Sequence, residues 1–185
     1  MAVAAGPARW WTVLSVVTAI LVGLVCCVIV WAFLPPVVFF PWFALAAWVL
    51  LILGAVWLVL GVVGWFKFRA LRVTTIAPVV VLATAGLVML SVPSTVAFAV
   101  SKGSLAAAAA PCVQTWDDRR IGMYQVRRIQ PVDGGCLFYI EGGLIDSIGL
   151  AYLPEGAPYL GKPRHDGDIG YTPYRGDWYR FVQRF

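Results

Sequence analysis

Residues 11–34 read WTVLSVVTAILVGLVCCVIVWAFL, and this stretch decides the fold class of the 185-residue chain. It contains no charged side chain. As a helix of about 24 residues it would be ~36 Å long, at ~1.5 Å of rise per residue. The hydrocarbon core of a bilayer is ~30 Å thick. The stretch therefore predicts a transmembrane helix.

Two similar runs follow, at residues 42–65 and 76–100, and both lack charged side chains. Hydrophobic residues make up 61% of the chain and charged residues 12%, against roughly 45–50% and ~25% in soluble domains. A soluble fold of this length cannot bury so much apolar surface. Pro93 lies inside the third run and predicts a kink there. We expect three transmembrane helices, with residues 66–75 as a loop and residues 101–111 as a linker.

Basic residues predict the direction in which these helices cross the membrane. They precede the first run and lie between the second and the third: Arg9, Lys67, Arg69 and Arg72. Short loops rich in Lys and Arg stay in the cytoplasm. We therefore expect a multi-pass protein of the cell membrane, with residues 1–10 and 66–75 in the cytoplasm and residues 112–185 outside it. Lys102 is a single basic residue on the outer side and does not outweigh the loop.

The net charge of +5 does not indicate a nucleic-acid-binding protein. All nine acidic residues lie at or after Asp117, and the Lys and Arg residues of that region balance them. The excess positive charge belongs to the ends of the apolar runs, where membrane topology places it. We expect the lipid bilayer as a partner, no nucleic acid and no cofactor.

Aromatic and small residues predict how the helices are anchored and packed. Tryptophans stand near the ends of the first two runs, at positions typical of interfacial anchors: Trp11, Trp31, Trp42 and Trp65. The mid-run Trp48 and Trp57 are expected to pack against neighbouring helices. Small residues recur at four-residue spacing at Ala19, Gly23 and Cys27. Such a stripe lets helices approach closely, either within the chain or between two copies of it.

Two of the four cysteines test this orientation. Cys26 and Cys27 are adjacent within the first run, so we expect small packing residues there. Cys112 and Cys136 both lie in the part placed outside the cytoplasm, and a disulfide between them would need an oxidising compartment. Closing a loop of this length would stabilise a small domain by ~3 kcal/mol. We expect this disulfide, with two free buried thiols as the alternative.

After Cys112 the pattern changes from long apolar runs to short segments rich in β-formers and turn residues. Asp133, Gly134 and Gly135 are typical of a hairpin turn. The candidate strands are Tyr124–Ile129, Cys136–Ile140, Ser147–Leu153 and Trp178–Phe185, the last with Tyr179, Phe181 and Phe185 on one face. Residues 154–176 carry several prolines and glycines and are expected to form an ordered loop. The fold class predicted is thus an α+β membrane protein, with helices before a small antiparallel β-rich extracytoplasmic domain.

Three short motifs in this region carry a resemblance to a known group of proteins. They are YIEGGLID at Tyr139–Asp146, GLAYLP at Gly149–Pro154 and GDWY at Gly176–Tyr179. In this order they resemble, over residues 135–185, the carboxyl-terminal part of actinobacterial multi-pass membrane proteins with a short outer domain. The resemblance implies a location and a type of host. It implies no activity and no catalytic residue, because that family has no established activity.

Candidate chemistry in the outer domain is sparse. His165 with Asp166 and Asp168 is a possible cation site, but the segment departs from a calcium loop at its sixth and last positions, so a solvated turn is favoured. Ser147 has no nucleophile-elbow motif around it. Glu141 and Asp146 are paired carboxylates that more often lie at a surface. These residues point to a hydrolase or a metal-binding domain only as an alternative.

The remaining signals favour a non-enzymatic role. A basic cluster just beyond the third run could meet anionic head groups or pair with Asp117 and Asp118: Arg119, Arg120, Arg127 and Arg128. The apolar runs lack the charged residues typical of transport paths. We expect a membrane-anchored envelope protein that presents a disulfide-stapled domain as a binding, accessory or structural subunit, with a protein partner or self-association through the small-residue stripe. An accessory subunit of a transporter is the further alternative.

Overall fold

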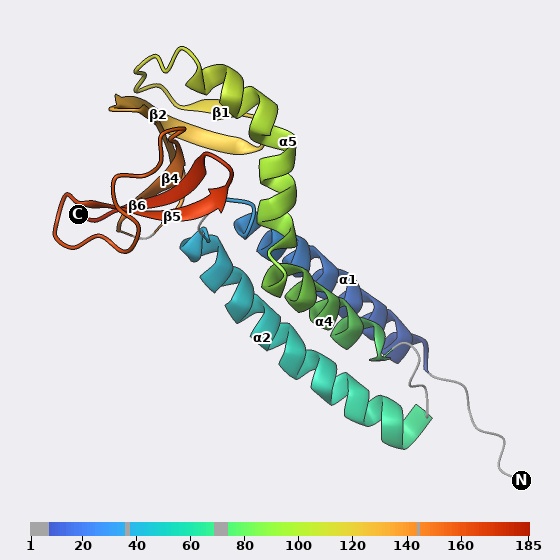
Figure 1. Cartoon of the computed structure of the whole chain (residues 1–185). Coiled ribbons are helices and arrows are strands. Elements are labelled where there is room, and N and C mark those ends of the chain that lie inside the picture. The colour runs from blue at the N-terminus through green and yellow to red at the C-terminus, as the bar shows by residue number, and fades with distance from the viewer. Residues whose placement is uncertain (1–7, 36–37, 69–73, 144) are drawn as a thin grey trace, which may run out of the picture. The chain divides into compact units, whose positions relative to one another are not determined.

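The computed structural model describes residues 8–35, 38–68, 74–143 and 145–185. These form two compact units, the first with Met1–Trp31 and Trp42–Leu90 and the second with Ala32–Pro41 and Ser91–Phe185 (Figure 1). The expectations for Arg69 and Arg72, and for most of residues 1–10, fall outside the described residues. The predicted fold class is confirmed: apolar helices precede an antiparallel sheet.

The first unit consists of helices. They are α1 (Arg9–Ala32), α2 (Phe40–Val63), the short π-helix η1 (Gly64–Phe68) and α4 (Ile76–Met89), with the ends of α1 and α2 shared with the second unit. Two helices, α1 and the continuous stretch from α2 through Lys67, are long and apolar enough to cross a membrane. A third crossing is available if the broken pair α4 and α5 (Val92–Ala109) counts as one span.

A narrow stripe of side chains joins the helices of the first unit. Val22 and Cys26 of α1 are buried with Ala77 of α4, and Trp57 of α2 packs against this cluster. Most other side chains of these helices point outward and are apolar, as lipid-facing residues are. The stripe predicted at Ala19, Gly23 and Cys27 lies beside the buried face, and Cys27 itself is exposed.

Two tryptophans do not lie where the sequence placed them. Trp11, predicted as an interfacial anchor, is fully buried, and its indole N–H donates to the carbonyl of Leu60 at 3.0 Å. Its ring also occupies the space beside Gly64, so a side chain there would overlap it. Trp48, expected to pack, is instead 68% exposed. Trp57 packs as expected and donates to the carbonyl of Thr74.

The third apolar run is interrupted. Helix α4 ends at Met89, and Ser91 adopts a left-handed conformation with φ of 53° before α5 begins. The kink predicted at Pro93 is therefore a break two residues earlier, and Pro93 lies in the first turn of α5, where its missing N–H costs little. The linker predicted at residues 101–111 is wrong: α5 continues to Ala109.

The second unit is built on a six-stranded antiparallel sheet of order β1-β2-β3-β4-β6-β5. Strands β1 to β4 follow one another as a meander, and β6 then pairs with β4 while β5 lies at the edge. The strands are β1 (Arg119–Ile121), β2 (Tyr124–Val132), β3 (Gly135–Ile140), β4 (Ser147–Tyr152), β5 (Ile169–Arg175) and β6 (Trp178–Gln183).

Helix α5 covers one face of this sheet (Figure 1). The buried residues of α5 recur every three or four positions and include Ala97, Phe98 and Leu105. Phe98 meets the sheet edge-on, with its ring centroid 4.8 Å from that of Tyr174 and 5.8 Å from that of Trp178. Ala97 and Phe98 were predicted in a membrane span and Leu105 in a linker, but all three form part of the core of the sheet domain.

The opposite face of the sheet has a second core. Leu137, Tyr139, Ala151 and Phe181 are buried there, and Ala157 of the following loop packs against them. Residues 154–168 form this covering loop, but residues 169–175 form the edge strand β5, so the loop predicted over 154–176 is partly wrong. Strand β1 was not predicted either. The predicted closing strand ends at Gln183, and Phe185 is 73% exposed.

A bulge in β2 decides which residues face this second core. Val126 pairs with Ile140 and Arg128 with Tyr139, so Arg127 is the extra residue. An extra residue in one strand reverses the alternation of side chains beyond it. As a result, Val126 and Ile129 both point to the α5 side, and Arg128 shares a face with Tyr139.

Candidate functional site

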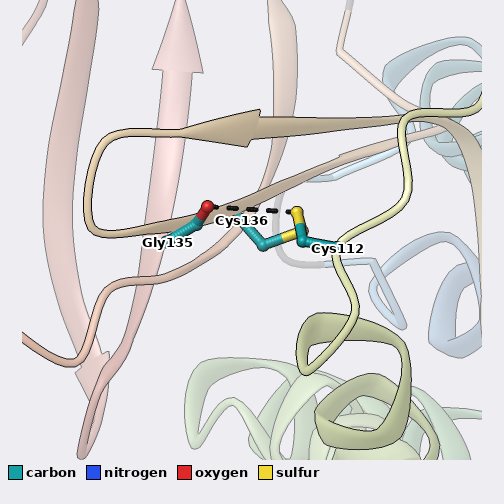
Figure 2. Close-up of a disulfide and its surroundings, with 3 residues drawn as sticks. All are labelled: Cys112, Gly135 and Cys136. Carbon is teal, nitrogen blue, oxygen red and sulfur yellow. Dashed lines mark hydrogen bonds between the residues drawn. A yellow bond between two sulfur atoms is a disulfide. The ribbon is translucent and has the colours of Figure 1, made fainter.

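The disulfide joins the end of α5 to the start of β3. Cys112 and Cys136 are bonded with their Cα atoms 5.8 Å apart, which confirms the predicted pairing (Figure 2). Figure 2 also marks a 3.9 Å contact between Cys112 Sγ and the carbonyl oxygen of Gly135. A sulfur in a disulfide carries no hydrogen to donate, so this contact is one of packing. The bond holds the helix that covers the sheet to the centre of that sheet.

A cleft of about 650 Å³ opens on the second unit. Its wall combines the start of β4, the loop before it and the bulged part of β2. Phe39, from the connection between α1 and α2, and Pro41, in the first turn of α2, complete the wall. The lining brings together charged, aromatic and aliphatic side chains, a mixture typical of small-molecule sites. We call this the β2–β4 cleft.

Arg128 is the most unusual residue of the β2–β4 cleft. Its guanidinium carbon lies 3.7 Å from the centroid of the Tyr139 ring and 4.9 Å from that of the Trp116 ring. Such stacking favours a cation through the negative faces of the rings. Among the described residues no carboxylate lies within ion-pair distance of Arg128, and its Nε–H is buried without a hydrogen-bond partner.

The Tyr139 ring, over which Arg128 lies, is held in place by its own contacts. The hydroxyl of Tyr139 donates to Gln183 Oε1 at 2.9 Å, and its ring packs edge-on against Phe181 with centroids 4.9 Å apart. Tyr139 is only 6% exposed. The β-bulge and this buried ring together hold the guanidinium in one place, so the position of Arg128 is determined by the sheet and not by a loop.

The other charged residues of the cleft are of both signs. Arg127 forms an ion pair with Glu141, at 2.9 Å between Nη2 and Oε1. Asp118 and Asp146 line the same cleft, and within the described part of the chain neither is paired with an arginine. Internal pairing of the basic cluster with Asp117 and Asp118 is therefore not what the structure contains.

The predicted basic cluster is divided. Arg127 and Arg128 line the β2–β4 cleft, whereas Arg119 and Arg120 are exposed on β1. Arg119 and Arg120 line a different hollow of about 490 Å³, beside the last turns of α5, which include Ser104. The four arginines thus line two different hollows.

Of the predicted metal candidates His165, Asp166 and Asp168, both carboxylates interact with neighbouring groups of the chain. The carboxylate of Asp168 accepts hydrogen bonds from the backbone N–H groups of Arg164 and Ile169. The first of these bonds contributes most to lowering the pKa of Asp168. Asp166 pairs with Arg184 at 3.3 Å. In the described ranges no three His, Cys, Asp or Glu side chains gather in a way that would hold a metal ion.

The candidate catalytic groups also lie apart. Ser147 opens β4 and pairs with Gln183 of β6, while His165 lies in the exposed loop before β5. Glu141 is held by Arg127, and so it is not a free partner for Asp146. The arrangement offers no nucleophile next to a base among the residues described.

Buried tyrosines are a further electrostatic feature of the sheet domain. Tyr124 lies in the core beneath α5, its hydroxyl has no hydrogen-bond partner among the described residues, and burial raises its pKa well above 10. Burial also raises the pKa of Tyr171 in the second core. Both hydroxyls are kept neutral, and neither lines the β2–β4 cleft.

Sequence reasoning missed Trp116 and Phe185 as parts of a site. Trp116 follows Cys112 in a segment without periodicity, and Phe185 was placed on one face of the last strand with Tyr179 and Phe181. One signal was present: Tyr124, Val126 and Ile129 break strict alternation, which is the mark of a bulge. That signal would have placed Arg128 on the face of Tyr139.

Comparison of the chain with protein-family models, with curated proteins and with solved structures gave no match.

Proposed function

We propose that this chain is a membrane-anchored envelope protein whose sheet domain lies outside the cytoplasm and acts as a non-enzymatic binding or accessory module. The disulfide between Cys112 and Cys136 carries the proposal. A structural disulfide belongs to an oxidising compartment, and the helices that precede it are apolar enough to cross a membrane. The resemblance of residues 135–185 to actinobacterial membrane proteins is in accord with this placement.

The proposed topology needs three crossings. Helix α4 has 14 residues, so it spans ~21 Å and is shorter than the ~30 Å core of a bilayer. We propose that the first turns of α5 complete the crossing. Val96 and Val100 support this, because they are exposed and apolar while Ala97 and Phe98 of the same turns are buried on the sheet domain.

A binding role is favoured over catalysis by the contents of the β2–β4 cleft. The cleft holds a fixed guanidinium and apolar walls, which can recognise a ligand. General acid–base or nucleophilic chemistry needs a nucleophile and a base within hydrogen-bond reach, and Ser147 and His165 do not provide this pair.

Cysteine labelling in intact cells tests the orientation. A maleimide that cannot cross membranes should label Cys112 and Cys136 only after an equally impermeant reductant has been added. The double variant Cys112→Ser/Cys136→Ser is the control for labelling elsewhere. If the pair reacts only after the membrane has been opened, the sheet domain faces the cytoplasm and the proposal fails.

Recovery of partners tests the accessory role. The tagged full chain, cross-linked in cells and solubilised gently, should bring down a defined partner or further copies of itself. The variant Arg128→Gln is the comparison for the cleft, and Arg120→Gln is the matched control on the other surface. Repeated recovery of the monomer alone would overturn an accessory role.

A further inference from the structure

Arg128 is a charge without a counter-charge. Its guanidinium carbon lies over the Tyr139 ring and near the Trp116 ring, and no carboxylate among the described residues is within ion-pair distance of it. Arg128 is partly exposed and lines the cleft, and a guanidinium is suited to bidentate binding of oxyanions such as phosphate and carboxylate. The unpaired charge therefore points to an anionic group that arrives with a ligand.

The ligand cannot be a simple polyanion. Asp118 and Asp146 line the same cleft, and no arginine pairs with either of them among the described residues. Arg127 is already neutralised by Glu141. Among the residues that the structure describes, the lining therefore offers one free cation and two free carboxylates. A group with a negative charge and a separate positive charge complements this lining better than a group with negative charge alone.

The rest of the cleft is apolar. Ile145, Ile148 and Phe185 line it, with Phe39 from the connection between α1 and α2 and Pro41 from the first turn of α2. Ile145 and Phe185 are 75% and 73% exposed, so they present apolar surface at the cleft. The occupant should therefore have an apolar body beside its charged groups. A volume of about 650 Å³ lies in the range of small-ligand sites.

We propose that the β2–β4 cleft binds the phosphate–ammonium head group of a zwitterionic amphiphile, of the phosphatidylethanolamine class. Arg128 receives the phosphate, and the carboxylates of Asp118 and Asp146 receive the ammonium. The apolar residues contact the first part of the acyl chains. The membrane as the source of this ligand rests on the proposed function, because there the connection between α1 and α2 lies at the outer membrane surface.

The test uses the full chain in detergent micelles, with lipids of matched acyl chains and binding followed by native mass spectrometry. Phosphatidylethanolamine should bind at least tenfold more tightly than phosphatidylcholine, whose quaternary ammonium has no N–H to donate. Its affinity should also exceed that of phosphatidylglycerol, whose head group lacks a cation. Equal binding of all three lipids would overturn the proposal.

Variants separate the two charged contacts. Arg128→Gln should weaken phosphatidylethanolamine binding at least tenfold, while Arg120→Gln, on the exposed strand β1, should leave it within twofold. Asp146→Asn should weaken the binding of phosphatidylethanolamine and leave the binding of phosphatidylglycerol unchanged. Retention of the disulfide and of the thermal midpoint shows that each variant is folded. A folded Arg128→Gln protein with undiminished binding would refute the site.

Soluble glycerophosphoethanolamine distinguishes the sources of the head group. It should displace the bound lipid, but only at a much higher concentration because it lacks the apolar part. Displacement at equal concentration would overturn the membrane source, and failure to displace at any concentration would overturn the head-group assignment. A detergent micelle does not separate two compartments, so these results do not depend on how the chain is oriented in the cell membrane. The cysteine labelling decides that orientation separately.

Discussion

At the scale of single residues, the core beneath α5 contains a group that weakens it. In the part of the chain that the structure describes, the buried hydroxyl of Tyr124 has no hydrogen-bond partner, and a buried unsatisfied hydroxyl costs about 1–3 kcal/mol. Tyr124→Phe should therefore raise the free energy of unfolding by about 1 kcal/mol at pH 7. Urea unfolding of the purified chain measures this, with Tyr179→Phe as the control. A less stable Tyr124→Phe protein would contradict it.

The same substitution should change the response to alkaline pH. Burial raises the pKa of Tyr124 in the folded state, so its contribution to stability is complete below the unfolded-state pKa of ~10 and is lost as the pH rises above that value. The advantage of Tyr124→Phe over the wild type should grow by about 1 kcal/mol between pH 10 and pH 11. Unfolding curves at both pH values check this, and a constant difference would show that Tyr124 ionises normally.

At the scale of elements, one hydroxyl joins α5 to the turn between β1 and β2. Ser101 is fully buried, and its Oγ accepts the backbone N–H of Met123 at 2.8 Å. Ser101→Ala leaves that N–H without a partner and should lower the stability by about 1–3 kcal/mol. Ser104→Ala, on the exposed face of the same helix, should change it by less than about 0.5 kcal/mol. Thermal unfolding of both variants makes the comparison, and equal effects would refute the role of Ser101.

The disulfide joins the same helix to β3. The bonded cysteines are 24 residues apart, so their removal should destabilise the sheet domain by ~3 kcal/mol through the greater freedom of the unfolded chain. The variant Cys112→Ser/Cys136→Ser tests this by chemical unfolding. Cys27→Ala, at an exposed position of α1, is the control and should have little effect. A loss under about 1 kcal/mol would mean that other contacts already hold the helix end.

The sequence predicted elements well where one signal dominated. Length and hydrophobicity located α1 and α2, and the alternation and turn residues around Asp133 located β2 and β3. It failed at α5, because Ala97 and Phe98 belong to the third apolar run and Leu105 to the predicted linker, and only the sheet shows what they pack against. It also missed β5, where Pro173 and the glycines suggest a loop, although β6 provides a strand partner.

At the scale of the whole molecule, the boundary of the sheet domain lies earlier than the cysteines suggest. The compact unit includes residues from Ser91 onward, and α5 supplies part of its core. A fragment of residues 91–185 should unfold cooperatively, whereas residues 111–185 should expose the uncovered face of the sheet. Denaturation curves and dye binding to apolar surface distinguish them. Cooperative unfolding of the shorter fragment would contradict the assigned boundary.

The candidate site was beyond the reach of sequence reasoning for a physical reason. The β2–β4 cleft combines Trp116, Arg128, Asp146 and Phe39, which are scattered along the chain and share no motif. Only the register of β2 against β3, shifted by the bulge, brings Arg128 over Tyr139. The sequence indicated the arginines as a surface cluster, but it could not show that two of them face a different hollow.

The strand order also has a consequence for synthesis and export. The meander from β1 to β4, with its disulfide, can form as soon as Tyr152 has emerged, but β4 stays open on one side until β6 is delivered. In the proposed orientation the domain would wait half-assembled at the exit of the translocation channel. Its cysteines could already be oxidised while the edge of β4 remained available to chaperones or to other chains. The last strand to arrive completes the sheet by entering between its two future neighbours.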